Sequence, residues 1–498
     1  MHLEYPKPHD DLVDELKDSA EFQPAHTGSG RRLAHRWGHR LSDESLAQTA
    51  SPLKDSAKTV DPSTIPLGTG RSNSLFYPWQ SMSMIGAKES HQSPALNPTI
   101  PMTCMKGESA FDFSYALNYA EPCGWSQLVA AFRENTSLIH NPPYQDWDTT
   151  LTCGSTSAID ISLRMFCNRG DWILTETCTY PGTLMALRAQ GLKTQGIEMD
   201  EDGLLPRDLD AKLRCWDGSR GRKPHVLYTI PTGHNPTGVT QSKARKNAIY
   251  EIAERYDLLI LEDDPYFFLR LDSSSARLDT HSTSSPFSQF RKVLPTSYLS
   301  LDKSGRVIRM ESTSKILAPG LRCGWLTASS QVVDIFMNFA EVGPSSPSGP
   351  SQVMLYKLLV ERWGREGFTD WLIYLSKEYQ LRRDALIAAC EKHLPKEICT
   401  WATPAYGIFL WIEVDLKRHP DFAETRAESC YTVEERIYEA AESNGVLVAR
   451  GSWFYTEKRT DKVFFRMTFV ATASQDDLKR GVEQFGKAVK EEFRSSQA

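Results

Sequence analysis

The feature that most constrains the fold is a series of short apolar segments between residues 110 and 340, separated by longer stretches with helical spacing. The segments are DWILTET (171–177), HVLYTI (225–230), LLILEDD (258–264), RVIRMES (306–312) and GWLTAS (324–329). Strands that are apolar on both faces are typical of mostly parallel sheets covered by helices on both sides. We therefore predict a large α/β domain over residues 111–340.

The rest of the chain divides into regions of different composition. Residues 1–62 are polar and rich in loop-forming residues, which predicts a partly disordered N-terminal arm. Residues 341–498 alternate amphipathic helices with the strands GIFLWIEV and KVFFRMTFV, which predicts a smaller α+β domain. We expect residues 63–110 to contribute to the small domain and the substrate site, and the serine-rich stretch 271–290 to be a surface insertion.

Charge and composition narrow the range of partners. A net charge of −6 over 498 residues leaves no basic surplus for binding a phosphate backbone. No stretch approaches 18 consecutive apolar residues, and the first residues lack the apolar run of a signal peptide. The ten cysteines lie far apart, without zinc-type spacing. We expect a cytoplasmic protein with reduced thiols and no nucleic acid, membrane or metal partner.

Polar side chains lie at five strand ends, of which four follow strands named above and the fifth is recognised only by the predicted helix start that comes after it. Ligands of parallel α/β sheets bind at these strand ends. In chain order the ends carry a helix start, an aromatic ring, an amide, an acid with a phenol, and a lysine with an arginine. These residues are Ser155 and Thr156 in CGSTSAID, Tyr180 in ETCTYPG, Asn235 in TGHNPTG, Asp263 and Tyr266 in EDDPYFF, and Ser312, Ser314, Lys315 and Arg322 in ESTSKILAPGLRCGW.

This set of groups matches the chemical needs of pyridoxal phosphate (PLP). A lone loop lysine is usually a surface residue, but here Lys315 can form the Schiff base and move the substrate proton. Asp263 can keep the pyridine nitrogen protonated, while Tyr266 and Asn235 can donate to the ring oxygen. Tyr180 can stack on the ring. The phosphate needs a helix start and charged donors, which Ser155, Thr156, Ser312, Ser314 and Arg322 can provide.

With these motifs in order, the chain resembles the fold-type I PLP-dependent aminotransferases. It is most similar to the fungal aromatic amino-acid aminotransferases, which are related to the 2-aminoadipate/kynurenine group. The resemblance spans about residues 67–490 and includes LGTGRSNSLFYPW, ALNYAEPCGWSQL, HNPTG, EDDPYFFL and FFRMTF. It implies an aspartate-aminotransferase-like large domain with a seven-stranded, mostly parallel sheet between helices, plus a smaller α+β domain.

The resemblance also implies roles for residues that spacing alone does not identify. Arg466 in FFRMTF matches the arginine that binds the substrate α-carboxylate, and Gly70 in LGTGR matches a glycine that lines the substrate site. Tyr119 matches a tyrosine that reaches the phosphate in the other subunit, which implies a homodimer with shared active sites. Lys54 stands where the family often has an arginine for a distal carboxylate. Arg450 stands where a proline is more usual.

The predicted reaction is the ping-pong transamination of an aromatic L-amino acid, namely phenylalanine, tyrosine or tryptophan, with a 2-oxo acid such as 2-oxoglutarate. A 2-aminoadipate or kynurenine aminotransferase is the first alternative. A lyase or decarboxylase that uses the same cofactor is another. A PLP-binding transcription regulator is a remote alternative, because the N-terminal arm is too short for a DNA-binding module with its linker and the chain is acidic.

Overall fold

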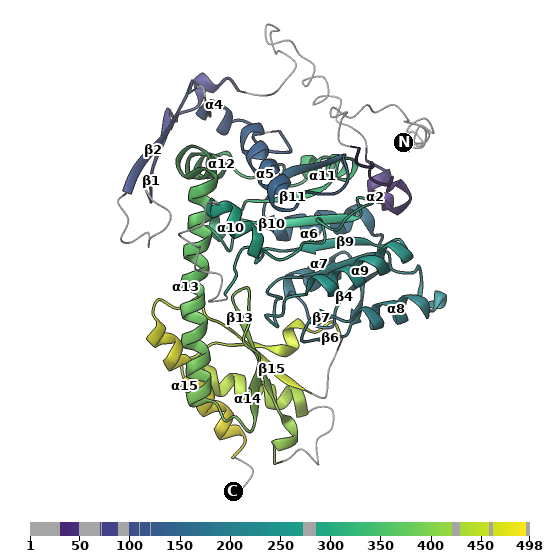
Figure 1. Cartoon of the computed structure of the whole chain (residues 1–498), viewed down its shortest axis with the longest axis vertical. Helices are drawn as coiled ribbons and strands as arrows, with labels where there is room; N and C mark the ends of the chain where they lie inside the picture. The colour runs from purple at the N-terminus through teal and green to yellow at the C-terminus, as the bar shows by residue number, and fades with distance from the viewer. Residues whose placement is uncertain are drawn as a thin grey trace, which may run out of the picture.

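The computed structural model describes residues 30–48, 70, 72–87, 99–108, 110–119, 121–271, 285–420, 429–457 and 462–494. Two sheets organise these residues, one of seven strands and one of four, and two short hairpins accompany them. In Figure 1 the seven-stranded sheet occupies the middle of the molecule and the four-stranded sheet lies below it.

The large sheet has the strand order β3-β11-β10-β9-β8-β4-β5. Strand β11 is antiparallel to both of its neighbours, and the other adjacent pairs are parallel. This confirms the predicted mostly parallel seven-stranded sheet. The strands are β3 (Trp147–Thr152), β4 (Trp172–Glu176), β5 (Lys193–Ile197), β8 (Val226–Thr229), β9 (Leu259–Asp263), β10 (Val307–Ser312) and β11 (Gly324–Ser329).

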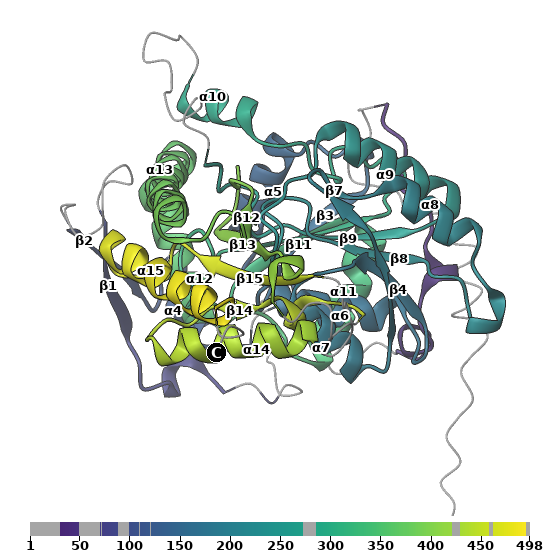
Figure 2. The ribbon, with the colours of Figure 1, turned by 90° about the horizontal axis from the view of Figure 1, so that it is seen from below.

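Helices cover both faces of the large sheet, and the side chains of β9 show why. Ile260 packs in one core with residues of α8 (Pro206–Arg214) and α9 (Lys243–Tyr256). Leu259 and Leu261 point the other way and belong to the core that contains α6 (Ser155–Phe166). Successive strand residues point to opposite faces, so a strand between two helical layers must be apolar throughout. Figure 2 shows the two helical layers edge on.

The small sheet has the order β12-β13-β15-β14 and is antiparallel throughout. Its strands are β12 (Cys399–Trp401), β13 (Phe409–Val414), β14 (Ala449–Arg450) and β15 (Val463–Thr468). Helices α14 (Ser429–Ser443) and α15 (Gln475–Glu492) accompany it, and Phe465 of β15 packs edge-on against Phe485 of α15. The long helix α13 (Gly364–His393) runs beside both sheets (Figure 1). The smaller antiparallel-sheet unit is thus as expected.

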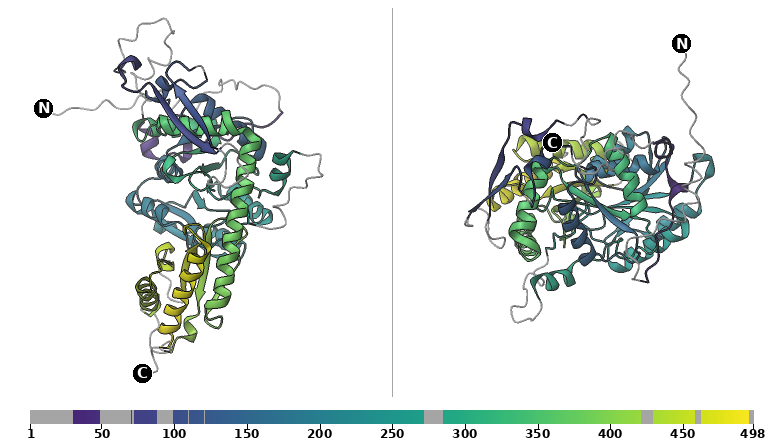
Figure 3. Two further views of the ribbon diagram at one scale, coloured as in Figure 1. Left: turned by 90° about the vertical axis from the view of Figure 1, so that its left-hand side faces the viewer. Right: turned by 90° about the horizontal axis from the view of Figure 1, so that it is seen from above.

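The hairpin of β1 (Ser81–Ala87) and β2 (Thr99–Met105) lies at the opposite end of the molecule from α15 (Figure 3). It lines an apolar cavity together with α12 (Gly349–Leu355) and the π-helix η5 (Tyr356–Trp363). The expected contribution of residues 63–110 to the small domain and the substrate site stays a prediction. Of the serine-rich stretch 271–290, residues 272–284 lie outside the described residues, and its last residues begin the helix α10 (Pro286–Val293).

The remaining elements are short, apart from three helices that flank the large sheet. None of the helices in the described ranges has the length and apolarity needed to cross a bilayer. The remaining elements are η1 (Gly38–Arg40), α2 (Asp43–Leu46), η2 (Ser74–Phe76), α4 (Phe113–Ala116), α5 (Ser126–Ile139), α7 (Pro181–Ala189), β6 (Met199–Asp200), β7 (Gly203–Leu204), η3 (Gly218–Arg220), η4 (Pro319–Leu321), α11 (Ser330–Val342), η6 (Leu416–Arg418) and η7 (Gly451–Phe454).

Candidate active site

The predicted polar residues gather at one edge of the large sheet. Strands β3, β4, β8, β9 and β10 all run in the same direction, so their carboxyl ends lie along the same edge. Each end leads into a segment that carries predicted site residues. Strand β15 of the small sheet contributes one more residue, Arg466, from the opposite side.

Asp263 is the last residue of β9 and is only 4% exposed. Its Oδ2 accepts a 2.7 Å hydrogen bond from the hydroxyl of Tyr228. Its Oδ1 is buried and has no hydrogen-bond partner among the described residues. Burial raises the pKa of Asp263 to about 7, while the Tyr228 hydrogen bond acts in the opposite direction. A buried carboxylate oxygen without a partner suits a cationic N–H donor from a ligand.

Lys315 lies in the loop after β10 and is half-buried. Burial lowers the pKa of its ammonium group, and the guanidinium groups of Arg466 and Arg322 lower it too, while Asp263 raises it. The lysine therefore lies within electrostatic reach of all three groups. A lowered pKa increases the fraction of neutral amine, which is the nucleophilic form.

Arg466 is positioned by an amide and two aromatic rings. Its Nη1 donates a 2.8 Å hydrogen bond to Oδ1 of Asn235. Its guanidinium carbon lies 4.1 Å from the ring centre of Phe409 and 4.9 Å from that of Phe454. Its Nε is buried without a hydrogen-bond partner in the described part of the chain. The guanidinium is therefore held flat, with Nε available to a carboxylate.

Tyr266 and Tyr180 complete the aromatic part of the site. Burial raises the pKa of Tyr266, and the Asn235 side chain and Arg466 lower it, so its hydroxyl lies among the groups named above. Tyr180 caps the start of α7, and its ring lies over Gly182. A Cβ at position 182 would be 2.4 Å from Cε1 of Tyr180, so the ring occupies the space that a larger residue would need.

The predicted phosphate side consists of the α6 start and the loop around Arg322. Gly154 precedes the helix at φ 90°, and a Cβ there would be 2.6 Å from Nη2 of Arg322. Arg322 donates from Nη2 to the carbonyl oxygen of Cys153 at 2.9 Å. Ser155 Oγ is buried without a partner among the described residues. Thr156 is exposed on the same turn. The hydroxyl of Ser312 donates to that of Ser314 at 2.9 Å.

These observations fit PLP. The site offers an amine of lowered pKa, an unpartnered buried carboxylate oxygen and an unpartnered hydroxyl at a helix start. An amine, an acid and an anion cradle are the three kinds of group that an aldehyde, a pyridinium and a phosphate require. The described residues contain no cluster of side chains suited to a metal ion.

Two predicted residues are not brought to this edge of the sheet in the single chain, and a third lies outside the described residues. Tyr119 follows α4 and is 75% exposed. Gly70 has no atom of the described residues, apart from its chain neighbours, within 4 Å of where its Cβ would lie. Lys54 lies outside the described residues. The roles expected for all three stay predictions.

Sequence reasoning missed four residues that shape the site. Phe409 and Phe454 flank Arg466, and Tyr228 holds Asp263. The tyrosine in the apolar strand HVLYTI was a visible signal, because a fully buried phenol needs a polar partner. The fourth is Glu434 of α14, which is buried and accepts hydrogen bonds from Ser452 and Arg450. Arg450 therefore has a structural partner in place of the usual proline.

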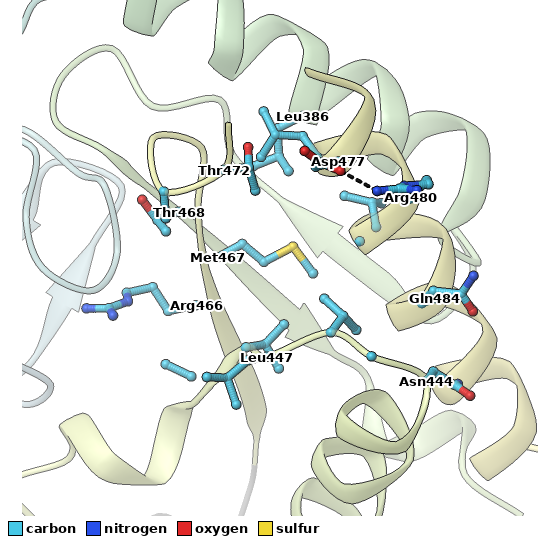
Figure 4. A pocket seen from close by; sticks show the side chains of 18 of the residues that line it. Leu386, Asn444, Leu447, Arg466, Met467, Thr468, Thr472, Asp477, Arg480 and Gln484 are labelled. Carbon is cyan, nitrogen blue, oxygen red and sulfur yellow. Dashed lines mark hydrogen bonds and ion pairs between the residues drawn. The ribbon is translucent and has the colours of Figure 1, made fainter. Parts of the chain in front are cut away.

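A cavity of about 760 Å³ lies between β15, α14 and α15 (Figure 4). Arg466 lies at its margin, with the guanidinium pointing away from Met467 and the other labelled side chains. Lys315 and Asp263 do not line it. The cavity is therefore separate from the cluster around Lys315.

Comparisons with known proteins agree with this geometry. Residues 123–485 match the model of the family described as aminotransferase class I and II. The chain is 66% identical to aminotransferase swnA of Arthroderma benhamiae, over the whole of both chains. It is 39% identical to an aromatic amino acid aminotransferase of Schizosaccharomyces pombe, over 92% of this chain and 98% of that protein.

Among solved structures, aminotransferase Aro8 from Candida albicans superposes with a TM-score of 0.85 and is 35% identical. The match covers 93% of this chain and 100% of that chain. With the family model spanning most of the sequence, the protein belongs to the class I and II aminotransferases, and it is a PLP-dependent transaminase.

Proposed function

We propose that the protein transfers the amino group of an aromatic L-amino acid to a 2-oxo acid such as 2-oxoglutarate. The observation that carries this proposal is the setting of Arg466, whose guanidinium lies over the rings of Phe409 and Phe454 and donates a hydrogen bond to Asn235. A flat, fixed guanidinium suits bidentate binding of an α-carboxylate. The aromatic rings of Phe409 and Phe454 beside it offer apolar surface for an aromatic side chain. The aromatic amino acid aminotransferase of Schizosaccharomyces pombe supports the same substrate class.

Each residue of the site has a task in this reaction. When bound, PLP supplies an aldehyde that condenses with primary amines and a ring that accepts the electron pair released at Cα. Lys315 takes the proton from the substrate Cα, because its lowered pKa leaves more of it neutral. Asp263 holds the proton on the ring nitrogen, and Arg466 orients the substrate by its carboxylate. The acidic acceptor also needs a donor for its second carboxylate, for which Lys54 remains the proposed residue.

We also propose that the active unit is a homodimer. Tyr119 is exposed in the single chain, and so are apolar side chains of α4, β1 and α12: Tyr115, Ile85 and Met354 are 63%, 73% and 42% exposed. The hairpin and α12 also line an apolar cavity of about 260 Å³ together with Leu317, two residues after Lys315. Exposed apolar side chains beside an apolar cavity are typical of an interface. A second subunit on this face would cover it and would bring Tyr119 to the partner's phosphate site.

The test of the substrate class is a donor panel. Purified protein with PLP and 2-oxoglutarate should form glutamate fastest with phenylalanine, tyrosine or tryptophan, and more slowly with leucine or methionine, because apolar slots discriminate weakly by size, by roughly 1–3 kcal/mol per methylene. A clear preference for 2-aminoadipate or kynurenine would replace this proposal with the first alternative. Absence of glutamate with every donor, together with release of carbon dioxide or ammonia, would indicate a decarboxylase or lyase.

A further inference from the structure

Tyr228 is a fully buried residue of β8, and in the described structure its hydroxyl donates a hydrogen bond to one carboxylate, that of Asp263. It donates to Oδ2 of Asp263 at 2.7 Å. In the parallel register of β8 and β9, Tyr228 lies opposite Leu261, two residues before Asp263. Side chains two apart on a strand share a face, so the Tyr228 ring and the Asp263 carboxylate form a diagonal cross-strand pair. The contact follows from the sheet itself and does not depend on a loop.

The two oxygens of Asp263 have different environments as a result. Oδ2 accepts the Tyr228 hydroxyl, while Oδ1 is buried with no partner among the described residues. A carboxylate held at one oxygen keeps its plane, and the other oxygen then faces a fixed direction. In the proposed reaction, Oδ1 would be the oxygen that accepts a hydrogen bond from the protonated ring nitrogen of PLP.

The pKa of Asp263 is set by opposing effects, and the Tyr228 hydrogen bond is one of those that lower it. Burial raises its pKa to about 7, and Asp264 raises it further. The Tyr228 hydrogen bond, Lys315 from the loop after β10 and Arg309 of β10 lower it. Loss of the phenol would therefore favour the protonated acid, which cannot hold a second proton for the ring.

We propose that Tyr228 is a positioning residue that orients the Asp263 carboxylate and keeps it ionised, so that Oδ1 is ready for the ring nitrogen of PLP. The inference rests on the proposed role of Asp263. Tyr228 itself would contact neither the substrate nor the cofactor and would act only through Asp263. This role predicts a pH effect on cofactor binding that a purely structural tyrosine would not cause.

The test is the pH dependence of PLP binding to the apoprotein, measured as the equilibrium dissociation constant. In Tyr228→Phe the acid-side midpoint of this profile should move up by about one pH unit, which is about tenfold in affinity on the acid side. Affinity should approach the wild-type value at higher pH. The ionisation of free PLP is the same in every titration, so it does not affect the comparison.

Tyr298→Phe is the matched control. Tyr298 is also fully buried, and its hydroxyl donates to Oε1 of Gln241 at 2.6 Å. Its loss should leave the midpoint unchanged. Equal weakening of PLP binding at all pH values in Tyr228→Phe would overturn the proposal. Should that variant fold poorly, 3-fluorotyrosine at position 228, a stronger donor, should move the midpoint down, and a midpoint that does not move would equally overturn it.

Asp263→Asn separates this inference from the proposed function. If Asp263 binds the ring nitrogen, the variant should bind PLP more weakly and lose the acid-side transition. Wild-type binding by Asp263→Asn would remove the role of Asp263 itself. Weak binding by Asp263→Asn together with an unshifted Tyr228→Phe profile would remove only the role of Tyr228.

Discussion

At the scale of single residues, the site keeps charged and polar groups in costly surroundings. Asp263 is buried with one oxygen unpartnered, and Lys315 has a lowered pKa because of burial and neighbouring arginines. Such groups are common in active sites, where their cost is offset when the ligand binds. The apoprotein should therefore become more stable when one of them is neutralised.

Asp263→Asn makes this cost measurable in the apoprotein. The folded-state pKa of Asp263 is about 7, against an ordinary value of 3.8. Between pH 3.8 and about 7, the Asp263 carboxyl is ionised in the unfolded chain and protonated in the folded chain. The contribution of Asp263 to the free energy of unfolding therefore falls as pH rises through this range and is constant above about pH 7. The variant should exceed wild type in free energy of unfolding by on the order of 2 kcal/mol at pH 8 and match it below pH 4, by urea denaturation. A variant less stable than wild type at pH 8 would contradict this.

Gly182→Ala tests the Tyr180 ring. The new Cβ would lie 2.4 Å from Cε1 of Tyr180, so the ring must move away from its present position. The dissociation constant of PLP should rise several-fold, since an aromatic stack is worth about 1 kcal/mol. Helix stability should not fall, because alanine favours helices. Gly218→Ala is the control, since its Cβ would meet no atom within 4 Å, and it should bind PLP normally.

At the scale of elements, the turn η7 places Phe454 against Arg466, and an ion-pair cluster holds this turn. Glu434 of α14 accepts from the backbone N–H of Ser452 at 2.9 Å and from Nε of Arg450 at 3.0 Å. Arg450 also pairs with Glu435 at 3.0 Å. These hydrogen bonds and ion pairs attach η7 and the preceding Arg450 to α14.

Arg450→Gln should loosen that attachment. Leaving Glu434 without its cation costs about 1–3 kcal/mol, and Phe454 loses part of its support. The Michaelis constant for the amino acid should rise several-fold, while the PLP dissociation constant stays within twofold, because the cofactor residues lie on the other sheet. Lys479→Gln, which removes an exposed pair with Asp476, should change neither constant. Equal effects of both variants would show that the attachment has no role.

Sequence patterns predicted the elements whose burial is uniform and missed those whose composition is mixed. Strands β8, β9, β10 and β11 are buried along their whole length and were predicted within one or two residues. Strands β3 and β5, with the sequences WDTTLT and KTQGI, carry too many polar residues to be recognised.

The same limit applies to the site. Lys315, Asp263 and Asn235 could be predicted from the sequence, because each lies at or just after the end of an apolar strand, where the sequence becomes polar. The rings of Phe409 and Phe454 were not predicted, since their contact with Arg466 depends on how β13, η7 and β15 assemble. A tertiary contact between apolar residues leaves no local signal.

At the scale of the whole molecule, the proposed dimer makes each site depend on two chains. A mixture of Tyr119→Ala and Lys315→Ala subunits tests this. In a mixed dimer, the subunit that keeps Lys315 would receive Tyr119 from its partner, and that one site would be native. Refolding the two variants together at equal amounts should restore activity from about a quarter of the native sites. Activity no higher than the sum of the separate variants would place Tyr119 outside the partner's site.

The central claim is that this site moves an amino group from an aromatic amino acid and retains it for a 2-oxo acid. The most direct measurement is a single half-reaction, with PLP-loaded protein and L-phenylalanine in the absence of acceptor. One equivalent of phenylpyruvate per subunit should form, without carbon dioxide or ammonia, and 2-oxoglutarate added afterwards should yield one equivalent of glutamate. Lys315→Ala should form neither product at a measurable rate. Sustained product formation without acceptor, or an active Lys315→Ala variant, would contradict the claim.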